Sequence, residues 1–305
     1  KDNFINLTVG GNATSSGNFS IKGNFVNNGT FESTINDNTI TFNGTSPQEI
    51  SGSGTSTFKK LILNNSFGLT FLSTNINIYQ LIESTTGSFT NNSSSIVLKS
   101  EVNDAAGMLK VSNSSDYDGN ITVERFFSST SNDFRMVGSP IEDTRLSHWQ
   151  YPTLTTGFLY CGFGGSNYTW TGCGGFCSVY FYNESQATDD DPTLGYDSAT
   201  NITNLVTPAK GTIIYSSSGN KKLSVSGRPE LEDFNVQITK GSTDSDRGWN
   251  LVSNPYPCTI DWDLFRASNP GIDNANWIYS GDVGNFIQST NNIPHSQGFW
   301  IKKTS

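Results

Sequence analysis

Apolar and polar residues alternate over short runs in the first 124 residues of the chain. A period of two, with no helical period, predicts strands, because successive side chains of a strand point to opposite faces. Gly, Asn and Ser separate the runs at intervals of about ten residues, which is typical of a many-stranded β architecture. The apolar positions are Phe19 and Ile21, Ile40 and Phe42, Leu61 and Leu63, Ile76 and Ile78, and Ile96 and Leu98.

An internal similarity indicates that these strands belong to stacked units. Phe4, Leu7 and Val9 match Phe58, Leu61 and Leu63, with 54 residues between equivalent positions. A long-period repeat of this kind favours a β-solenoid, in which each coil buries a thin core only by stacking on its neighbours. A plain sandwich of hairpins is the alternative.

The pattern changes near residue 125, where longer apolar residues, Arg and Trp enter and the loops lengthen. We therefore predict an all-β protein with a parallel β-solenoid-like repeat region over 1–124 and a β-sandwich domain with long, disulfide-braced loops over 125–305. Residues 261–270 predict one short helix, capped by Asp261. The strands expected in the second region are GTIIYSSS, KKLSVSG, FNVQITKG, GWNLVSN and QGFWIKK.

Composition narrows the possible partners. The net charge is −9, and clustered Lys and Arg are missing, which argues against nucleic acid and against an anionic membrane surface. No stretch approaches eighteen apolar residues, so we expect no direct membrane insertion. The first residues lack an apolar signal core, and we expect that a signal was removed or that the chain is part of a longer one.

Four cysteines occur, three of them in the Gly-rich stretch GFLYCGFGGSNYTWTGCGGFCSVYFY. Zinc would need a further soft ligand nearby, and the chain has only two histidines. Two disulfides are the favoured prediction, with the pairing open. The cysteines are Cys161, Cys173, Cys177 and Cys258.

Candidate catalytic groups are few. A nucleophilic triad would need His148 or His295 as its base, and we interpret His295 as an exposed turn residue. Asp261 and Asp263 flank Trp262, and a pair of carboxylates could act in glycoside cleavage. Both residues also suit the first turn of the predicted helix, where their negative charge is favourable. We assign no catalytic residue and predict a protein that is not an enzyme.

The densest group of oxygen ligands lies in the loop that contains Asp189, Asp190, Asp191 and Asp197. Calcium takes six to eight oxygens from such carboxylates, although the alternating spacing of a calcium loop is missing here. We predict no cofactor other than calcium at this loop, with a solvated acidic loop as the alternative. For ligand contact, the aromatic residues Tyr168 and Trp170 of the Gly-rich stretch are the candidates, with packing in the core as the alternative.

The stretch GWNLVSNPYPCTIDW, residues 248–262, could be either an active-site loop or a structural motif. Trp249 and Leu251 alternate with Asn250 as on a half-buried strand. Pro255 and Pro257 then end the ladder, and the amide of Asn254 is placed to bond loop backbone and lock the turn. We interpret the block as part of the scaffold.

This block resembles the GWNL-x-NPYP-x-x-x-DW block of secreted surface proteins of Bacteroidota. The segments ITVERFF, DFRMVGSPI, PAKGTIIY and IPHSQGFWIKK resemble its usual companions, so that the similarity covers roughly 120–303. Upstream, TFNGTSPQEISGSGTSTFKKLILNN resembles the β-helical repeats of the same large proteins. The resemblance implies export by the type IX secretion machinery, and Ser198 in Asp197-Ser198-Ala199 resembles an O-glycosylation site of these bacteria. Because their C-terminal sorting domain is absent here, we expect a piece of a longer precursor.

Two functions follow as hypotheses. The favoured one is a non-catalytic, extracellular, cell-surface structural or adhesive protein, part of a larger adhesin or filament, that associates with itself or with other surface proteins through β surfaces. The alternative is a carbohydrate-binding accessory segment of a secreted polysaccharide-degrading enzyme, with glycans as partners.

Overall fold

The computed structural model describes residues 2–101, 107–127, 133–149, 179–201, 203–216, 221–242, 244, 247–280 and 284–304. The chain forms two compact units. The first contains Lys1–Arg125 and Ser226–Glu232, and the second contains Phe126–Val225 and Asp233–Ser305. The division falls one residue after the boundary expected from the sequence, and the return of Ser226–Glu232 to the first unit was not foreseen.

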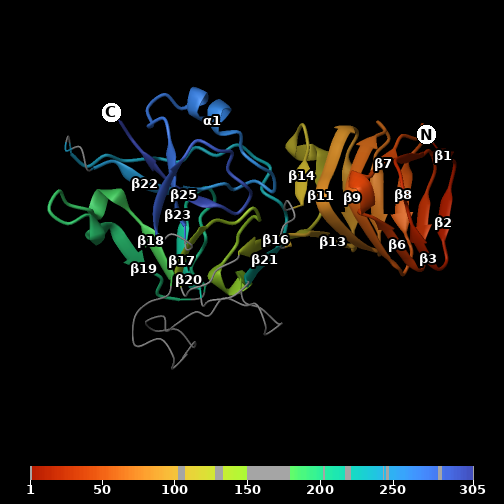
Figure 1. Cartoon of the computed structure of the whole chain (residues 1–305), viewed down its shortest axis with the longest axis horizontal. Helices are drawn as coiled ribbons and strands as arrows, with labels where there is room; N and C mark the ends of the chain where they lie inside the picture. Colours follow the sequence, from red (N-terminus) through yellow and green to blue (C-terminus); the bar gives the residue numbers. More distant parts are fainter. Residues whose placement is uncertain are drawn as a thin grey trace. The chain divides into compact units, whose positions relative to one another are not determined.

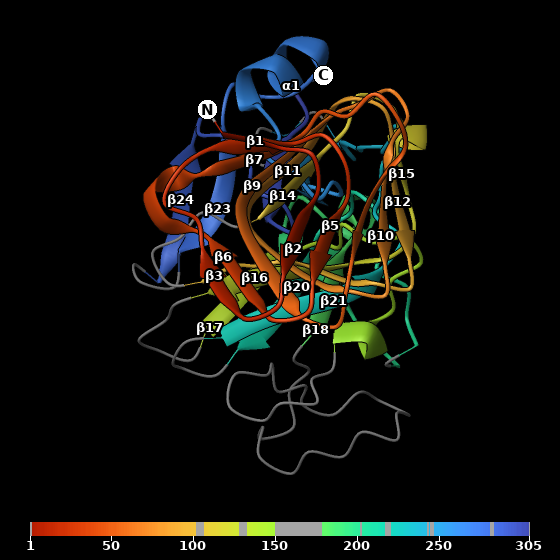
Figure 2. The ribbon, with the colours of Figure 1, turned by 90° about the vertical axis from the view of Figure 1, so that its right-hand side faces the viewer.

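The first unit is a parallel β-solenoid of about six turns, which confirms the predicted fold and excludes the alternative of stacked hairpins. Three faces run along it, and the long strands β9 and β11 each turn a corner from one face to the next. Figure 1 shows its strands side by side, and Figure 2 shows the coils behind one another. The strands are β1 (Asp2–Phe4), β2 (Leu7–Val9), β3 (Asn12–Thr14), β4 (Phe19–Ile21), β5 (Phe25–Asn27), β6 (Thr30–Ser33), β7 (Thr39–Phe42), β8 (Gln48–Ser51), β9 (Thr55–Asn64), β10 (Leu69–Leu72), β11 (Asn75–Thr86), β12 (Phe89–Asn92), β13 (Ser95–Leu98), β14 (Met108–Lys110), β15 (Tyr117–Asp118) and β16 (Ile121–Phe127), with β21 (Lys221–Gly227) beside β16.

Equivalent apolar residues of successive coils lie directly above one another. Phe19 pairs with Ile40 and Ile40 with Leu61, in steps of 21 residues, and all three are buried. The similarity over 54 residues therefore does not mark the repeat. Leu7 lies in the β2–β15 sheet, whereas its supposed equivalent Leu61 lies in the other sheet. The repeat is one coil of about 20 residues, too variable in length to show as a strict sequence period.

Buried amides satisfy the backbone at the corners of the solenoid. The side chain of Gln48 donates to the carbonyls of Ile21 (3.0 Å) and Gly23 (2.6 Å) and accepts from the Gly44 N–H (2.8 Å) and from the Asn65 amide (3.0 Å). Turns are not part of the strand ladders, so their inward backbone groups need such partners. The Gln of the repeat-like segment TFNGTSPQEISG is therefore a structural residue.

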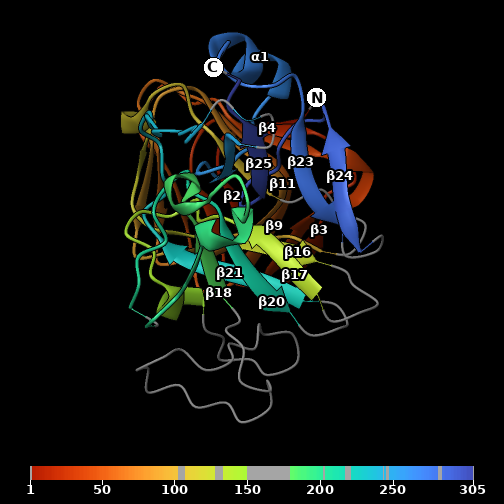
Figure 3. The ribbon, with the colours of Figure 1, turned by 90° about the vertical axis from the view of Figure 1, so that its left-hand side faces the viewer.

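The second unit contains two four-stranded antiparallel sheets, arranged as a β-sandwich (Figure 3). The order is β17-β20-β18-β19 in one sheet and β22-β25-β23-β24 in the other. FNVQITKG, expected as a strand, is not one: residues 233–240 form no ladder, and the side chain of Asn250 bonds both the N–H and the carbonyl of Thr239 instead. The strands are β17 (Asp133–Val137), β18 (Val179–Tyr182), β19 (Tyr196–Ser198), β20 (Thr212–Ser216), β22 (Trp249–Ser253), β23 (Asn276–Ser280), β24 (Asn285–Ser289) and β25 (Gly298–Lys302).

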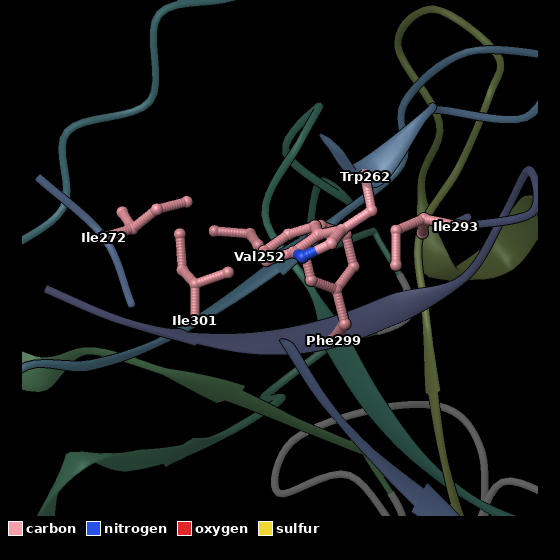
Figure 4. Close-up of a cluster of buried hydrophobic side chains, with 6 residues drawn as sticks. All are labelled: Val252, Trp262, Ile272, Ile293, Phe299 and Ile301. Atoms are coloured by element: carbon pink, nitrogen blue, oxygen red, sulfur yellow. The ribbon is translucent and has the colours of Figure 1, made fainter. Parts of the chain in front are cut away.

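The predicted helix is confirmed as α1 (Trp262–Ser268), and the side chain of Asp261 caps it by accepting from the Leu264 N–H at 3.0 Å. Short 3-10 helices lie at Ile35–Asp37, Ser114–Asp116, Leu146–Trp149, Glu184–Gln186 and Pro192–Gly195. In the described part of the chain, none of the helices is long and apolar enough to span a bilayer. Trp262 lies in a core cluster beside Phe299, with a ring-centroid distance of 6.2 Å (Figure 4). Val252, Ile272, Ile293 and Ile301 complete the cluster.

The block at 248–262 is a structural motif, as interpreted from the sequence. Asn254 is fully buried, and its amide donates to the carbonyls of Cys258 (2.7 Å) and Ile293 (3.0 Å) and accepts from the Tyr256 N–H (2.9 Å). The strand before it is not half-buried as expected, because Leu251 and Val252 face two different core clusters. Both faces of β22 are therefore covered.

Candidate functional site

The first coil of the solenoid that the structure describes consists of β1, β2 and β3, one strand on each of the three faces. Among the described residues, β1 pairs only with β4, β2 with β5, and β3 with β6. The side chains of Phe4 and Ile5 are exposed, and a hollow of about 310 Å³ between this coil and the next reaches Phe19 and Phe31 of the core.

The hydrogen bonds show which backbone groups of the first coil point outward. The Leu7 N–H donates to the Asn24 carbonyl, and the Val9 carbonyl accepts from the Asn28 N–H. In a parallel ladder the N–H and C=O of one residue point to the same side, and the next residue points to the other. Thr8 on β2 therefore points outward, and Asn12 on β3 does so by the same alternation, since Gly11 accepts from Thr30.

The first described coil lacks the residues that usually protect strand edges. Residues 2–14 include no Lys, Arg or Pro, although such residues normally prevent pairing with another chain. The last coil differs, because Lys110 of β14 pairs with Glu83 (2.5 Å) and Asp118 of β15 pairs with Arg228 (3.4 Å). The first and last described coils therefore differ in the charged side chains that their strands carry.

The second unit has two adjoining hollows with aromatic walls, of about 370 and 540 Å³. They share Thr193, Tyr196 and Phe286, so the two exposed rings form a ridge between them. The sequence gave no signal that Tyr196 of the edge strand β19 and Phe286 of the edge strand β24 would line the same hollows. The other residues are Tyr182, Trp249, Trp277 and Trp300 in the first hollow, and Phe134, Met136, Tyr180, Ile213 and Tyr279 in the second.

The four aspartates of the acidic loop are not brought together in the structure. Asp189 accepts from Arg247 (3.2 Å) and from the Ser242 hydroxyl (2.7 Å), and Asp191 caps the 3-10 helix at Pro192–Gly195. Asp190 is exposed, and Asp197 lies on the exposed strand β19. Within the described ranges, no three His, Cys, Asp or Glu side chains are placed to hold a metal.

A buried ion pair that the sequence did not suggest lies beside this loop. Glu184 accepts from Arg247 Nε (3.0 Å), from the Gly241 N–H (2.9 Å) and from the Gly248 N–H (3.2 Å). Burial raises the pKa of Glu184, but these hydrogen bonds outweigh it and hold the pKa below its ordinary value. The two partners are 63 residues apart, a separation at which no sequence spacing indicates a pair.

His295 is not the exposed turn residue that the sequence suggested. It is 1% exposed, its Nδ1 lies 3.2 Å from the Ser296 hydroxyl, and Ser296 is itself buried. The turn is covered because the strand that follows it, β25, lies at the centre of its sheet. A substrate could not reach this His–Ser pair without opening the unit.

Several residues singled out from the sequence lie outside the described residues: Cys161, Cys173, Cys177, Tyr168 and Trp170. Cys258 is half-buried in the turn locked by Asn254. Ser198 is exposed on β19 and remains a predicted glycosylation position. No protein-family model matches the chain, and neither the curated proteins nor the solved structures contain a match.

Proposed function

We propose that the chain is a non-catalytic structural or adhesive protein of the cell surface that associates with itself or with other surface proteins through its β strands. The observation that supports the proposal is the parallel solenoid itself, in which each coil extends three ladders by one strand, and the outward backbone groups of Thr8 and Asn12 can pair with one strand more. In solutions of the 305-residue chain, a coil of a second copy would extend each ladder by one strand and cover Phe4 and Ile5.

The remaining parts of the proposal come from the resemblance to surface proteins of Bacteroidota. They are extracellular location, export by the type IX secretion machinery, and a role within a larger adhesin or filament. Contact with other surface proteins belongs to the same proposal. The alternative function, a carbohydrate-binding accessory segment of a secreted enzyme, has its predicted contacts Tyr168 and Trp170 outside the described residues.

The self-association can be tested by sedimentation velocity of the 305-residue chain over a range of concentrations. We expect concentration-dependent oligomers for the natural sequence and monomers for the double variant Thr8→Pro and Asn12→Pro. Proline removes the outward N–H at both positions and leaves the inward ladder to β5 and β6 intact.

Ser66→Pro is the matched control, because Ser66 is the second residue of an exposed turn closed by the Gly68 N–H and the Asn65 carbonyl (2.9 Å). This control should associate like the natural chain, and far-UV circular dichroism should show all three proteins folded. A natural chain that sediments as a monomer at every concentration, or a folded double variant that still associates, would disprove the proposed self-association.

A further inference from the structure

The two aromatic hollows of the second unit have the size and composition of a ligand site. Volumes of about 370 and 540 Å³ lie in the range of small-molecule sites, which are lined mainly by apolar and aromatic side chains with a few polar groups. The ridge residues Tyr196 and Phe286 are 39% and 42% exposed, so a ligand can reach the rings without opening the sandwich.

The rings stand at right angles and offer walls in different directions. Tyr182 and Trp300 meet at 80° with centroids 4.6 Å apart, Tyr196 meets Trp300 at 84°, and Trp249 meets Trp277 at 86°. Each face carries the negative part of the ring quadrupole and attracts C–H groups with partial positive charge. A compact ring with polarised C–H bonds would be held on more than one side.

Polar groups in the hollows are uncharged. The lining residues that the structure describes include no acid or base, and neither the Tyr182 nor the Tyr196 hydroxyl is hydrogen-bonded to another described residue. Burial raises the pKa of both phenols, that of Tyr182 to about 12, so both stay neutral at ordinary pH. An entirely apolar ligand would bury these hydroxyls without hydrogen-bond partners, which weakens its binding.

We propose that the aromatic hollows bind a neutral saccharide, with its C–H faces against the rings of Tyr196, Phe286 and the half-buried indoles of Trp249 and Trp277 and its hydroxyls bonded to the two phenols. A sugar satisfies both requirements of the site, because it presents C–H faces and hydroxyl edges on one rigid ring. Acidic sugars are disfavoured, because no described lining residue is a base that could pair with a carboxylate and the chain carries a net charge of −9. Single-stranded nucleic acid also stacks on aromatic rings, but it needs basic groups that the lining lacks.

The test uses retention of the protein on insoluble neutral polysaccharides (cellulose, xylan, mannan and a β-1,3-glucan), with alginate and polygalacturonate as acidic probes. Soluble oligosaccharides of any polymer that retains the protein are then titrated by calorimetry. Tryptophan fluorescence should change on binding, since Trp249, Trp277 and Trp300 line the first hollow.

Tyr196→Ala and Phe286→Ala should each weaken saccharide binding about two- to tenfold, the equivalent of one ring contact. Tyr196→Phe keeps the ring and loses the hydroxyl, and should weaken binding less than Tyr196→Ala. Leu194→Ala is the matched control, because Leu194 is 53% exposed, lies two residues from Tyr196 and does not line either hollow. All variants are compared by thermal unfolding.

Three results would overturn the inference: no retention on any neutral polymer, preference for the acidic probes, or binding that Tyr196→Ala and Phe286→Ala leave unchanged. A displayed peptide that binds the hollows and is not displaced by sugars would assign the site to an extended peptide instead. The measurements are repeated in the Thr8→Pro and Asn12→Pro background, so that failure of sugar binding is distinguished from failure of self-association.

Discussion

The two units bury their apolar residues in opposite ways. In the solenoid the same kind of contact recurs from coil to coil, with Phe25, Phe31 and Phe58 packed at centroid distances of 5.2 to 6.2 Å. In the second unit each cluster is built once, from strands, a helix and loops that are far apart in the sequence. The comparison indicates that a repetitive core leaves function to its ends and edges, whereas an irregular core leaves hollows that can become sites.

The largest expected effect comes from removing a ring of the repetitive core. Phe58→Ala should lower the free energy of unfolding of the solenoid by about 3–5 kcal/mol, because the cavity would be enclosed by coils on both sides. All six tryptophans lie in the second unit, so urea unfolding by tryptophan fluorescence reports on that unit and far-UV circular dichroism reports on both. We expect Phe58→Ala to lower the urea midpoint of the transition seen by circular dichroism and to leave the midpoint seen by tryptophan fluorescence unchanged.

Phe67→Ala is the control for this experiment, since Phe67 is 60% exposed in a turn of the same unit. It should change stability by no more than about 0.5 kcal/mol. If Phe58→Ala moves both transitions together, the two units unfold cooperatively and the contrast between them does not extend to their stability.

An intermediate effect is expected for the buried amides that lock turns in both units. Gln48→Ala and Asn254→Ala each leave backbone groups without partners, at a cost of about 1–3 kcal/mol for each group. Gln48→Ala should destabilise the solenoid and Asn254→Ala the second unit, as measured by the two optical signals above. Asn291→Ala should have little effect, because the exposed side chain of Asn291 bonds no other described residue. A loss of stability as large as that of Asn254→Ala would contradict the assignment.

The strands, turn and helix end that depend on a local sequence pattern were predicted correctly. Period-two runs located the solenoid strands, the proline pair located the turn locked by Asn254, and Asp261 located the helix N-terminus. Features that depend on long-range placement were missed or wrong: the burial of His295, the ion pair of Glu184 with Arg247, and the absence of a ladder at 233–240. In the last case the pattern was that of a strand, but the side chain of Asn250 replaced the neighbouring strand.

The aromatic hollows were missed for the same reason. Tyr196 and Phe286 lie on the edge strands of different sheets, and only the packing of those sheets brings their rings to one place. The outward backbone groups of the first described coil were anticipated only in general terms, as exposed strand edges, because alternation gives the face of each side chain but not the position of a strand in its sheet.

The smallest expected effect concerns alkaline pH and separates the aromatic residues of the second unit from those of the first. Burial raises the pKa of Tyr182 from 10.0 to about 12, so the unfolded chain loses this proton first as the pH rises. Between pH 10 and 12 the unfolded state therefore binds fewer protons, and stability falls with increasing pH. Tyr182→Phe should reduce this fall in the tryptophan-monitored transition. Tyr117→Phe should not, because Tyr117, whose pKa burial also raises, lies in the solenoid. Thermal unfolding at several pH values measures both, and an identical pH profile for Tyr182→Phe and the natural chain would show that the phenol is not desolvated by the aromatic cluster around it.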